Sequence, residues 1–341
     1  MSLENSEWLN RNTLIGFTEK RGKAWHFRAS DQGAEPNHYP GAIPVEDVRR
    51  RLFPWTAIQA EVSAYVTDET GGITWYPDPT RMAVVRSDNG DILGVHGAES
   101  YRIHPYQEWL LDNVALILDQ DLSIGSAGLL KGGAVAWVQV ERPENLELAA
   151  GVTLRPWILA RTSHDGSLKS GYSAGATNVV CDNTLAAGVR EGEKNGTLYT
   201  VRHTSRGEFQ LGSARQAMGI MFKMEEEFAK EVDTLTSTKV SDAEWQQFLD
   251  SLVPVPEDDG AGRTRAMNKQ AKLGLLWRND ERVAPWTGTA WGVLQAVSTF
   301  NQHEATIRGM DRPERNMLST VYGKFQEQDS KTLKRLEAVL A

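Results

Sequence analysis

The pattern of apolar and polar residues predicts strands over the first two thirds of the chain. Residues 56–66 alternate apolar and polar side chains, which is typical of a half-buried strand. Residues 82–97 form a predicted hairpin, because Asn89-Gly90 between two apolar runs favours a tight turn. A second hairpin is predicted where Asp165-Gly166 joins two further runs. The additional predicted strands are residues 134–140, 157–162, 170–177 and 198–204.

A helical period replaces this alternation toward the C-terminus. Residues 213–236 predict one long helix, and Asp242 is a suitable N-cap for the next. The remaining predicted helices are short ones at residues 44–53 and after Pro105, and C-terminal ones at residues 263–278, 289–307 and 312–340. The order of elements predicts an α+β fold, with an antiparallel, hairpin-rich sheet backed by long helices and a helical C-terminal part.

This order also suggests where the domains divide. Residues 1–43 are polar and rich in turn-forming residues, so we expect an irregular lead-in. Residues 44–253 would form the α+β core, and residues 263–341 the helical part. Between them, residues 254–262 carry the proline and glycine of a linker.

Composition limits the compartment. The chain of 341 residues has a single cysteine, Cys181, which allows neither an internal disulfide nor a cysteine-based zinc site. The first residues lack the basic and apolar regions of a signal peptide, and no apolar run is long enough to span a bilayer. We therefore expect a cytoplasmic protein without a membrane partner.

No motif for a known chemistry stands out. The glycine-rich segment around Lys131 lacks the Ser or Thr that follows the lysine of a phosphate-binding loop. The seven histidines show no spacing typical of metal ligands, and Cys181 lies in an apolar context typical of an inert buried thiol. We therefore assign no catalytic residue, no metal and no cofactor, and regard an enzyme as the less favoured class.

Charge is distributed unevenly along the chain. The net charge is −8, yet residues 155–215 carry eight Lys or Arg against five acids, which gives 8 − 5 = +3. Residues 225–259 carry eleven acids and two lysines, which gives 2 − 11 = −9. A basic, β-rich stretch in an acidic chain is typical of a groove that follows phosphates, and a solvated sheet face with incidental charge is the alternative.

Several short motifs follow one another in a fixed order along the chain. They are Trp25-His26, Trp55-Thr56, Ala83-Val84-Val85-Arg86, Leu93-Gly94-Val95, Gly97 with Tyr101-Arg102, Ala127-Gly128-Leu129 with Gly132-Gly133, Thr162 to Ser167, Val179 to Leu185, Arg202-His203-Thr204, Gly288 to Trp291 and Ala296-Val297. Their order resembles a family encoded by phages and plasmids, the domain-of-unknown-function family nine-three-two, often labelled phage/plasmid-like protein. The resemblance spans roughly residues 24–340 and implies a mobile-element origin, with the host cytoplasm as the compartment if the chain is phage-encoded, but no activity. One departure is Phe27-Arg28, where relatives usually place glycine and an apolar residue.

The first functional hypothesis is a nucleic-acid-binding protein that binds or anneals single-stranded DNA. A hairpin-rich sheet backed by a long helix is similar to the plan of phage single-strand annealing proteins, which form oligomers, so we also expect a homo-oligomer. Lysine and arginine side chains would contact the phosphates, and aromatic side chains would stack on the nucleobases. The candidate residues are Trp157, Arg161, Lys169, Tyr172, Arg202, His203, Arg206 and Arg215.

Two alternatives remain. An enzyme or small-ligand binder would use a polar site of His164, Asp165, Asp182 and Asn183, together with His203, if both β segments share a sheet. A structural or host-interaction phage protein would use the acidic stretch of residues 225–259 and the Trp-rich C-terminal helices as contact surfaces.

Overall fold

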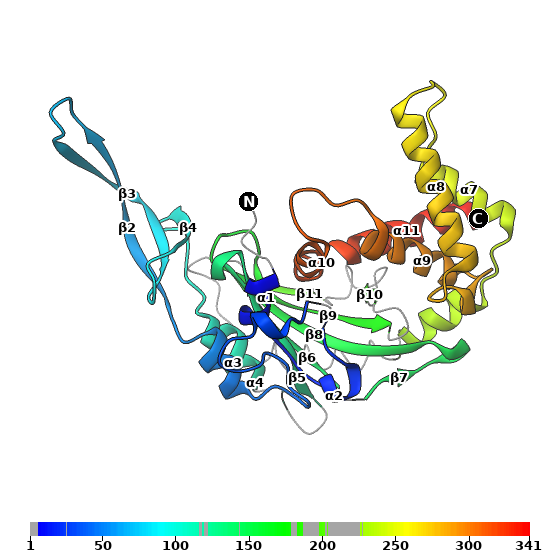
Figure 1. Cartoon of the computed structure of the whole chain (residues 1–341), viewed down its shortest axis with the longest axis horizontal. Coiled ribbons are helices and arrows are strands. Elements are labelled where there is room, and N and C mark those ends of the chain that lie inside the picture. The colour runs from blue at the N-terminus through cyan, green and yellow to red at the C-terminus, as the bar shows by residue number, and fades with distance from the viewer. Residues whose placement is uncertain are drawn as a thin grey trace. The chain divides into compact units, whose positions relative to one another are not determined.

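The computed structural model describes residues 6–24, 26–115, 118, 122–142, 144–178, 183–186, 198–201, 203, 226 and 228–341 (Figure 1). The chain divides into two compact units. Unit 1 takes in residues 1–143, 158–173 and 198–218, and unit 2 takes in residues 144–157, 174–197 and 219–341. The predicted linker at residues 254–262 and the helices on both sides of it all belong to unit 2.

Unit 1 contains the central strands of the larger sheet. Strand β5 pairs antiparallel with β1 on one side and with β6 on the other. The sheet continues from β6 to β8 and β9, and β11 pairs antiparallel with β9. The strands are β1 (Thr13–Ile15), β5 (Ser123–Leu130), β6 (Val135–Glu141), β8 (Thr153–Ser163), β9 (Ser170–Asn178) and β11 (Leu198–Val201), of which β8 and β9 contribute residues to both units.

Helices and turns complete this unit. Helix η2 (Gln107–Asp112) is a π-helix that buries Trp109, Leu110 and Leu111, and it confirms the helix expected after Pro105. The others are α1 (Ser6–Asn12), α2 (Thr18–Arg21), η1 (Ala29–Asp31), α3 (Val45–Leu52), α4 (Asn113–Ala115) and η3 (Lys131–Gly133).

Unit 1 also contains a separate three-stranded sheet, in which two of the strands form a long hairpin. Strands β2 (Ala57–Thr67) and β3 (Ile73–Arg86) pair along their whole length, whereas β4 (Ile92–Gly97) pairs only with residues 81–85 of β3. The turn between β3 and β4 contains Gly90 at a φ of 78°, which confirms the tight turn predicted at Asn89-Gly90. Figure 1 shows the β2–β3 ribbon extending well past β4.

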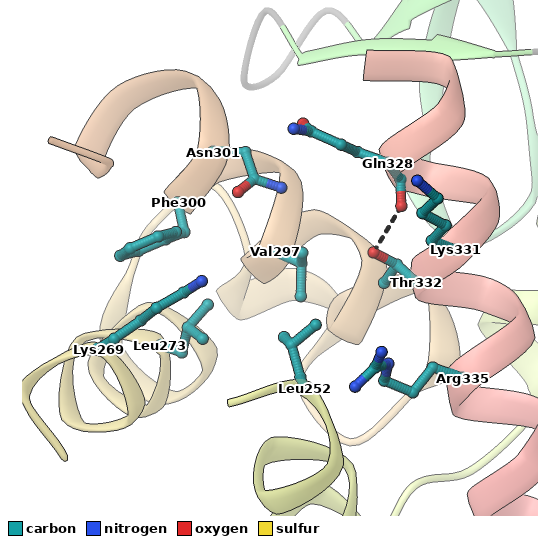
Figure 2. Close-up of a pocket in the computed structure, with 10 residues that line it drawn as sticks. All are labelled: Leu252, Lys269, Leu273, Val297, Phe300, Asn301, Gln328, Lys331, Thr332 and Arg335. Atoms are coloured by element: carbon teal, nitrogen blue, oxygen red, sulfur yellow. Dashed lines mark hydrogen bonds between the residues drawn. The ribbon is translucent and has the colours of Figure 1, made fainter. Parts of the chain in front are cut away.

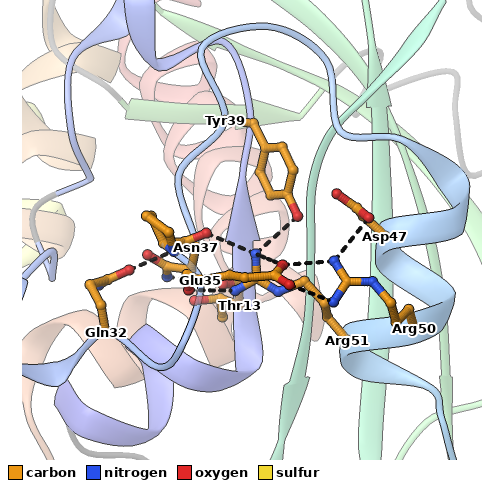
Figure 3. A network of polar contacts seen from close by, with 9 residues as sticks. Thr13, Gln32, Glu35, Asn37, Tyr39, Asp47, Arg50 and Arg51 are labelled. Atoms are coloured by element: carbon orange, nitrogen blue, oxygen red, sulfur yellow. Dashed lines mark hydrogen bonds and ion pairs between the residues drawn. The ribbon is translucent and has the colours of Figure 1, made fainter.

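The described part of the lead-in, residues 6–24 and 26–43, is more ordered than the sequence suggested. Its backbone is held by polar side chains, as Figure 3 shows. The guanidinium of Arg50 donates to both carboxylate oxygens of Glu35, at 2.8 and 2.7 Å, and Asn37 Nδ2 donates to the carbonyl of Thr13 at 2.9 Å. These contacts join residues far apart in the chain, so local turn propensity could not indicate them.

Unit 2 is mainly helical and confirms the α+β prediction of a helical C-terminal part. Its helices are α7 (Asp242–Leu252), α8 (Ala261–Asn279), η5 (Ala284–Trp286), α9 (Ala290–Thr299), η6 (Phe300–Glu304), α10 (Arg312–Val321) and α11 (Lys324–Leu340). Shorter elements are β7 (Leu146–Glu147), η4 (Ala149–Gly151) and β10 (Asn183–Ala186), which pairs with β9. None of the described helices combines the length and the apolar character needed to cross a membrane.

Candidate functional site

The basic residues predicted to contact phosphates do not form one exposed surface in the described part of the chain. Lys169 is exposed, but Arg161 is buried within β8, where burial lowers its pKa. Arg202, Arg206 and Arg215 lie outside the described residues. The predicted contacts of these three arginines therefore remain predictions.

The two rings proposed to stack on bases are both internal. Trp157 and Tyr172 lie in β8 and β9 and are buried, and the Tyr172 hydroxyl donates to the carbonyl of Trp109 at 3.4 Å. A stacking platform needs an exposed ring face, which neither ring presents. The reason is their position on inner strands, which sequence alternation does not reveal.

Of the residues predicted for the alternative polar site, His203 lies in unit 1 within a column of stacked rings. His96 stacks on Tyr101 with ring centroids 3.7 Å apart, and Tyr101 stacks on His203 at 5.0 Å. His203 stacks on His104 at 4.1 Å, and His104 stacks on Trp109 at 4.0 Å. We call these five residues the ring column.

Hydroxyl groups connect the column to the sheet. Ser170 Oγ lies 2.7 Å from His104 Nδ1 and 3.2 Å from His203 Nε2. The same oxygen lies 2.6 Å from Thr162 Oγ1, and His203 Nδ1 lies 3.2 Å from the carbonyl of Arg102. Since a carbonyl only accepts, Nδ1 of His203 carries the proton and Nε2 is the acceptor of the neutral ring.

Burial keeps these imidazoles neutral. Desolvation, and then the charges of neighbouring histidines, lowers the pKa of His104 and of His164 to about 3. Desolvation also lowers the pKa of His203 to about 4. His164 stacks on Tyr106 at 4.1 Å, is 0 % exposed, and neither of its ring nitrogens has a hydrogen-bond partner among the described residues.

Asp165 serves the turn that follows β8. Its Oδ2 accepts from Lys131 Nζ at 2.9 Å, and its Oδ1 accepts from the backbone N–H of Ser167 at 2.9 Å. Asp182 lies outside the described residues, and only the backbone of Asn183 is described, in β10. The structure therefore places His164 and His203 in a closed aromatic core. In the described part of the chain, Asp165 accepts no hydrogen bond from either imidazole.

Unit 2 contains a cationic cavity that sequence reasoning missed. The cavity measures about 190 Å³ and is formed by the ends of α7 and α9, one face of α8, η6 and one face of α11 (Figure 2). Three of its lining side chains are basic, three are polar and uncharged, four are apolar, and none is acidic. They are Leu252, Lys269, Leu273, Val297, Phe300, Asn301, Gln328, Lys331, Thr332 and Arg335.

The polar groups of this cavity are only partly satisfied within the protein. Partial burial lowers the pKa of Lys269, whose ammonium lies 5.3 Å from the centroid of the Phe300 ring. Lys331 pairs with Glu327 at 2.5 Å, and Arg335 donates to the carbonyl of Ser251. Gln328 Oε1 is buried and has no hydrogen-bond partner among the described residues.

Two sequence features could have indicated this cavity. Helix α8, Ala261–Asn279, carries five Lys or Arg and no acid. On α11, Lys331 and Arg335 are four residues apart and therefore lie on one face.

Among the described residues no group of three or more His, Cys, Asp or Glu side chains could hold a metal ion, so neither the ring column nor the cavity offers a metal site there.

Comparison with known proteins identifies only a family. Residues 93–339 match the family model described as domain of unknown function, DUF932, and this match covers more than half of the chain. No curated protein and no solved structure matches.

Proposed function

The chain belongs to the DUF932 family, a domain of unknown function, and from the chemistry of unit 2 we propose that it binds single-stranded nucleic acid at the cationic cavity. The observation that carries this proposal is the convergence of Lys269, Lys331 and Arg335 on one cavity without an acidic lining side chain. A phosphate there would pair with the ammonium of Lys269, whose pKa desolvation lowers. A phage or plasmid origin, which the resemblance implies, remains a prediction consistent with this role.

The other lining groups favour a nucleotide over a bare anion. The Phe300 ring, beside the Lys269 ammonium, offers an apolar face for a base, and base–aromatic stacking contributes about 1–3 kcal/mol per base. The unpartnered Oε1 of Gln328 can accept a hydrogen bond from a base or a sugar hydroxyl. Single strands fit this chemistry better than duplexes, since their bases are free to stack.

Fluorescence anisotropy with a labelled oligonucleotide tests the proposal. The variant with Lys269→Gln, Lys331→Gln and Arg335→Gln should bind at least tenfold more weakly than the unmodified chain at low salt. Phe300→Leu should weaken binding to a single strand more than binding to the matching duplex. The control variant combines Lys324→Gln and Lys334→Gln, which change two exposed lysines on the same helix outside the cavity.

Loss of folding is a separate outcome that thermal unfolding detects. Because Arg335 also contacts the carbonyl of Ser251, the double variant Lys269→Gln and Lys331→Gln provides a second test that keeps this contact. Equal affinity of the double variant and the control variant would overturn the proposal. Binding of mononucleotide or inorganic phosphate without binding of the oligonucleotide would also overturn it and would favour a small-ligand site.

A further inference from the structure

The large exposed apolar side chains of the described residues gather in two places. Eight of the eleven lie in the three-stranded sheet of unit 1, and two more lie on α8 of unit 2. Exposed apolar side chains gathered in one patch usually mark an interaction surface.

The first surface is the end of the β2–β3 ribbon, residues 62–80, which we call the arm. Tyr65 and Trp75 are directly opposite each other, their ring centroids are 5.3 Å apart, and they are 61 % and 62 % exposed. Ile73 lies on the same face of the ribbon, while Val66 and Tyr76 lie on the other, so both faces are apolar. A two-stranded ribbon is marginally stable by itself, and cover by a partner would stabilise it.

The charge of the arm limits the kinds of partner surface that can bind it. The arm carries Asp68, Glu69 and Asp78 and no Lys, Arg or His. Hydrogen bonds from Thr70 and Thr80 lower the pKa of Asp68 and of Asp78, so both stay ionised at neutral pH. An acidic arm repels phosphates and anionic lipids, and a basic protein surface with apolar side chains is its complement.

The second surface is the outer face of α8. Met267 and Leu275 are 50 % and 58 % exposed, and with Ala271 they follow a spacing of four residues along one face of the helix. This face is opposite the buried Leu273, which lines the cationic cavity. Of the five basic residues of this helix, Arg263 and Arg278 lie at the two ends of this face, four residues before Met267 and three after Leu275. Arg263 pairs with Asp259, and Lys269 belongs to the cavity on the other face.

We propose that the arm of one copy of the chain docks on the outer face of α8 of a second copy. The occupant is a second copy because this chain itself carries the surface that complements the arm in both charge and apolar character. Two different surfaces meet in such a contact. Because each arm docks on the next copy and not back on the first, the contact is heterologous and leads to rings or filaments, whereas two copies that exchanged arms would close a two-fold dimer. The proposal is independent of nucleic-acid binding, since the cavity uses the opposite face of α8.

Sedimentation of the full chain over a range of concentrations tests this assembly. The unmodified chain should form species larger than a dimer, and added salt should weaken them because it screens the opposite charges. The arm variant Tyr65→Thr and Trp75→Thr keeps residues that suit a strand, and it should weaken self-association at least tenfold. The helix variant Met267→Ser and Leu275→Ser should do the same, whereas the control Met310→Ser, at another exposed apolar residue, should not.

Mixing the two variants distinguishes the heterologous contact from others. The arm variant keeps an intact α8 and the helix variant keeps an intact arm, so an equal mixture should form a one-to-one heterodimer that grows no further. A helix variant that still assembles like the unmodified chain would overturn the proposal in favour of arm-to-arm pairing. A monomer at all concentrations, or a mixture that stays monomeric while both variants unfold like the unmodified chain, would also overturn it.

Discussion

The imidazole of His104 stacks on that of His203 at 4.1 Å, and both rings contact the same hydroxyl oxygen of Ser170. Neutral imidazoles are compatible with this arrangement, because protonation of both would place two buried positive charges face to face. The ring column is therefore a packed aromatic core in which burial lowers the pKa of His104 and of His203, so its stability depends on pH.

We expect the protein to lose stability as the pH falls below about 6.5, and His164→Phe to reduce this loss. A histidine whose folded-state pKa is lowered contributes stability above its unfolded pKa, and that contribution is lost as the pH falls toward the folded value of about 3. Phenylalanine keeps the ring on Tyr106, and the ring nitrogens of His164 have no partner to lose among the described residues. The free energy of unfolding of the variant, relative to that of the unmodified chain, should be about 2 kcal/mol higher at pH 5 than at pH 8. Urea unfolding from pH 4 to pH 8 measures this, and parallel pH curves for both chains would contradict it.

A buried carboxyl gives the opposite dependence on pH in unit 2. Burial raises the pKa of Asp329 to about 7, although a hydrogen bond from Ser298 Oγ at 2.7 Å favours the ionised form. Because the folded-state pKa is above the unfolded value of 3.8, stability is lost as the pH rises from about 4 to 7. Asp329→Asn should therefore raise the free energy of unfolding at pH 8 by up to ~4 kcal/mol relative to its effect at pH 4. The exposed Asp258→Asn is the control, and an Asp329→Asn variant with an unchanged pH profile would show that this carboxyl ionises freely.

A glycine in β5 should tolerate no side chain. Gly128 pairs with Trp137 across the β5–β6 ladder, and a Cβ on Gly128 would lie within 2.1 Å of the Trp137 ring. Gly128→Ala should destabilise the protein by about 1–3 kcal/mol, since an inserted methyl group in a packed core displaces its neighbours. Thermal unfolding measures the change, and Gly33→Ala, which has open space around it, is the matched control. Equal melting temperatures for the two variants would mean that Trp137 can move aside.

This glycine also shows why the sequence indicated some elements and missed others. The hairpin at Asn89-Gly90 was predictable, because the turn needs a positive φ that glycine adopts easily. No strand was predicted over the glycine-rich residues 124–133, yet Gly128 lies in β5, where the indole of Trp137 occupies the space of a side chain. Similarly, residues 312–340 suggested one helix, and the structure has two, which are separated at Gly323 with a φ of 72°.

The candidate sites illustrate the same limit. Of the predicted polar site, His164 and His203 are both buried and interact electrostatically, whereas Asp182 lies outside the described residues. The cationic cavity depends on side chains from four separate segments, including Lys269 and Lys331. Their convergence comes from the packing of helices, which apolar periodicity suggests only for single elements. Counting charges within single stretches of sequence therefore could not indicate this cavity.

The salt dependence of nucleic-acid affinity gives a final prediction, which follows from the proposed phosphate contacts. Each phosphate neutralised on a single strand contributes about −0.7 to the slope of log affinity against log salt. Removal of Lys269, Lys331 and Arg335 should make this slope shallower by about 2, whereas Phe300→Leu should lower the affinity and leave the slope unchanged. The two kinds of variant thus separate charge from stacking in one titration series with a labelled oligonucleotide. A slope that the three charge substitutions leave unchanged would place the phosphate contacts elsewhere on the chain, as on the predicted arginines of residues 202–215.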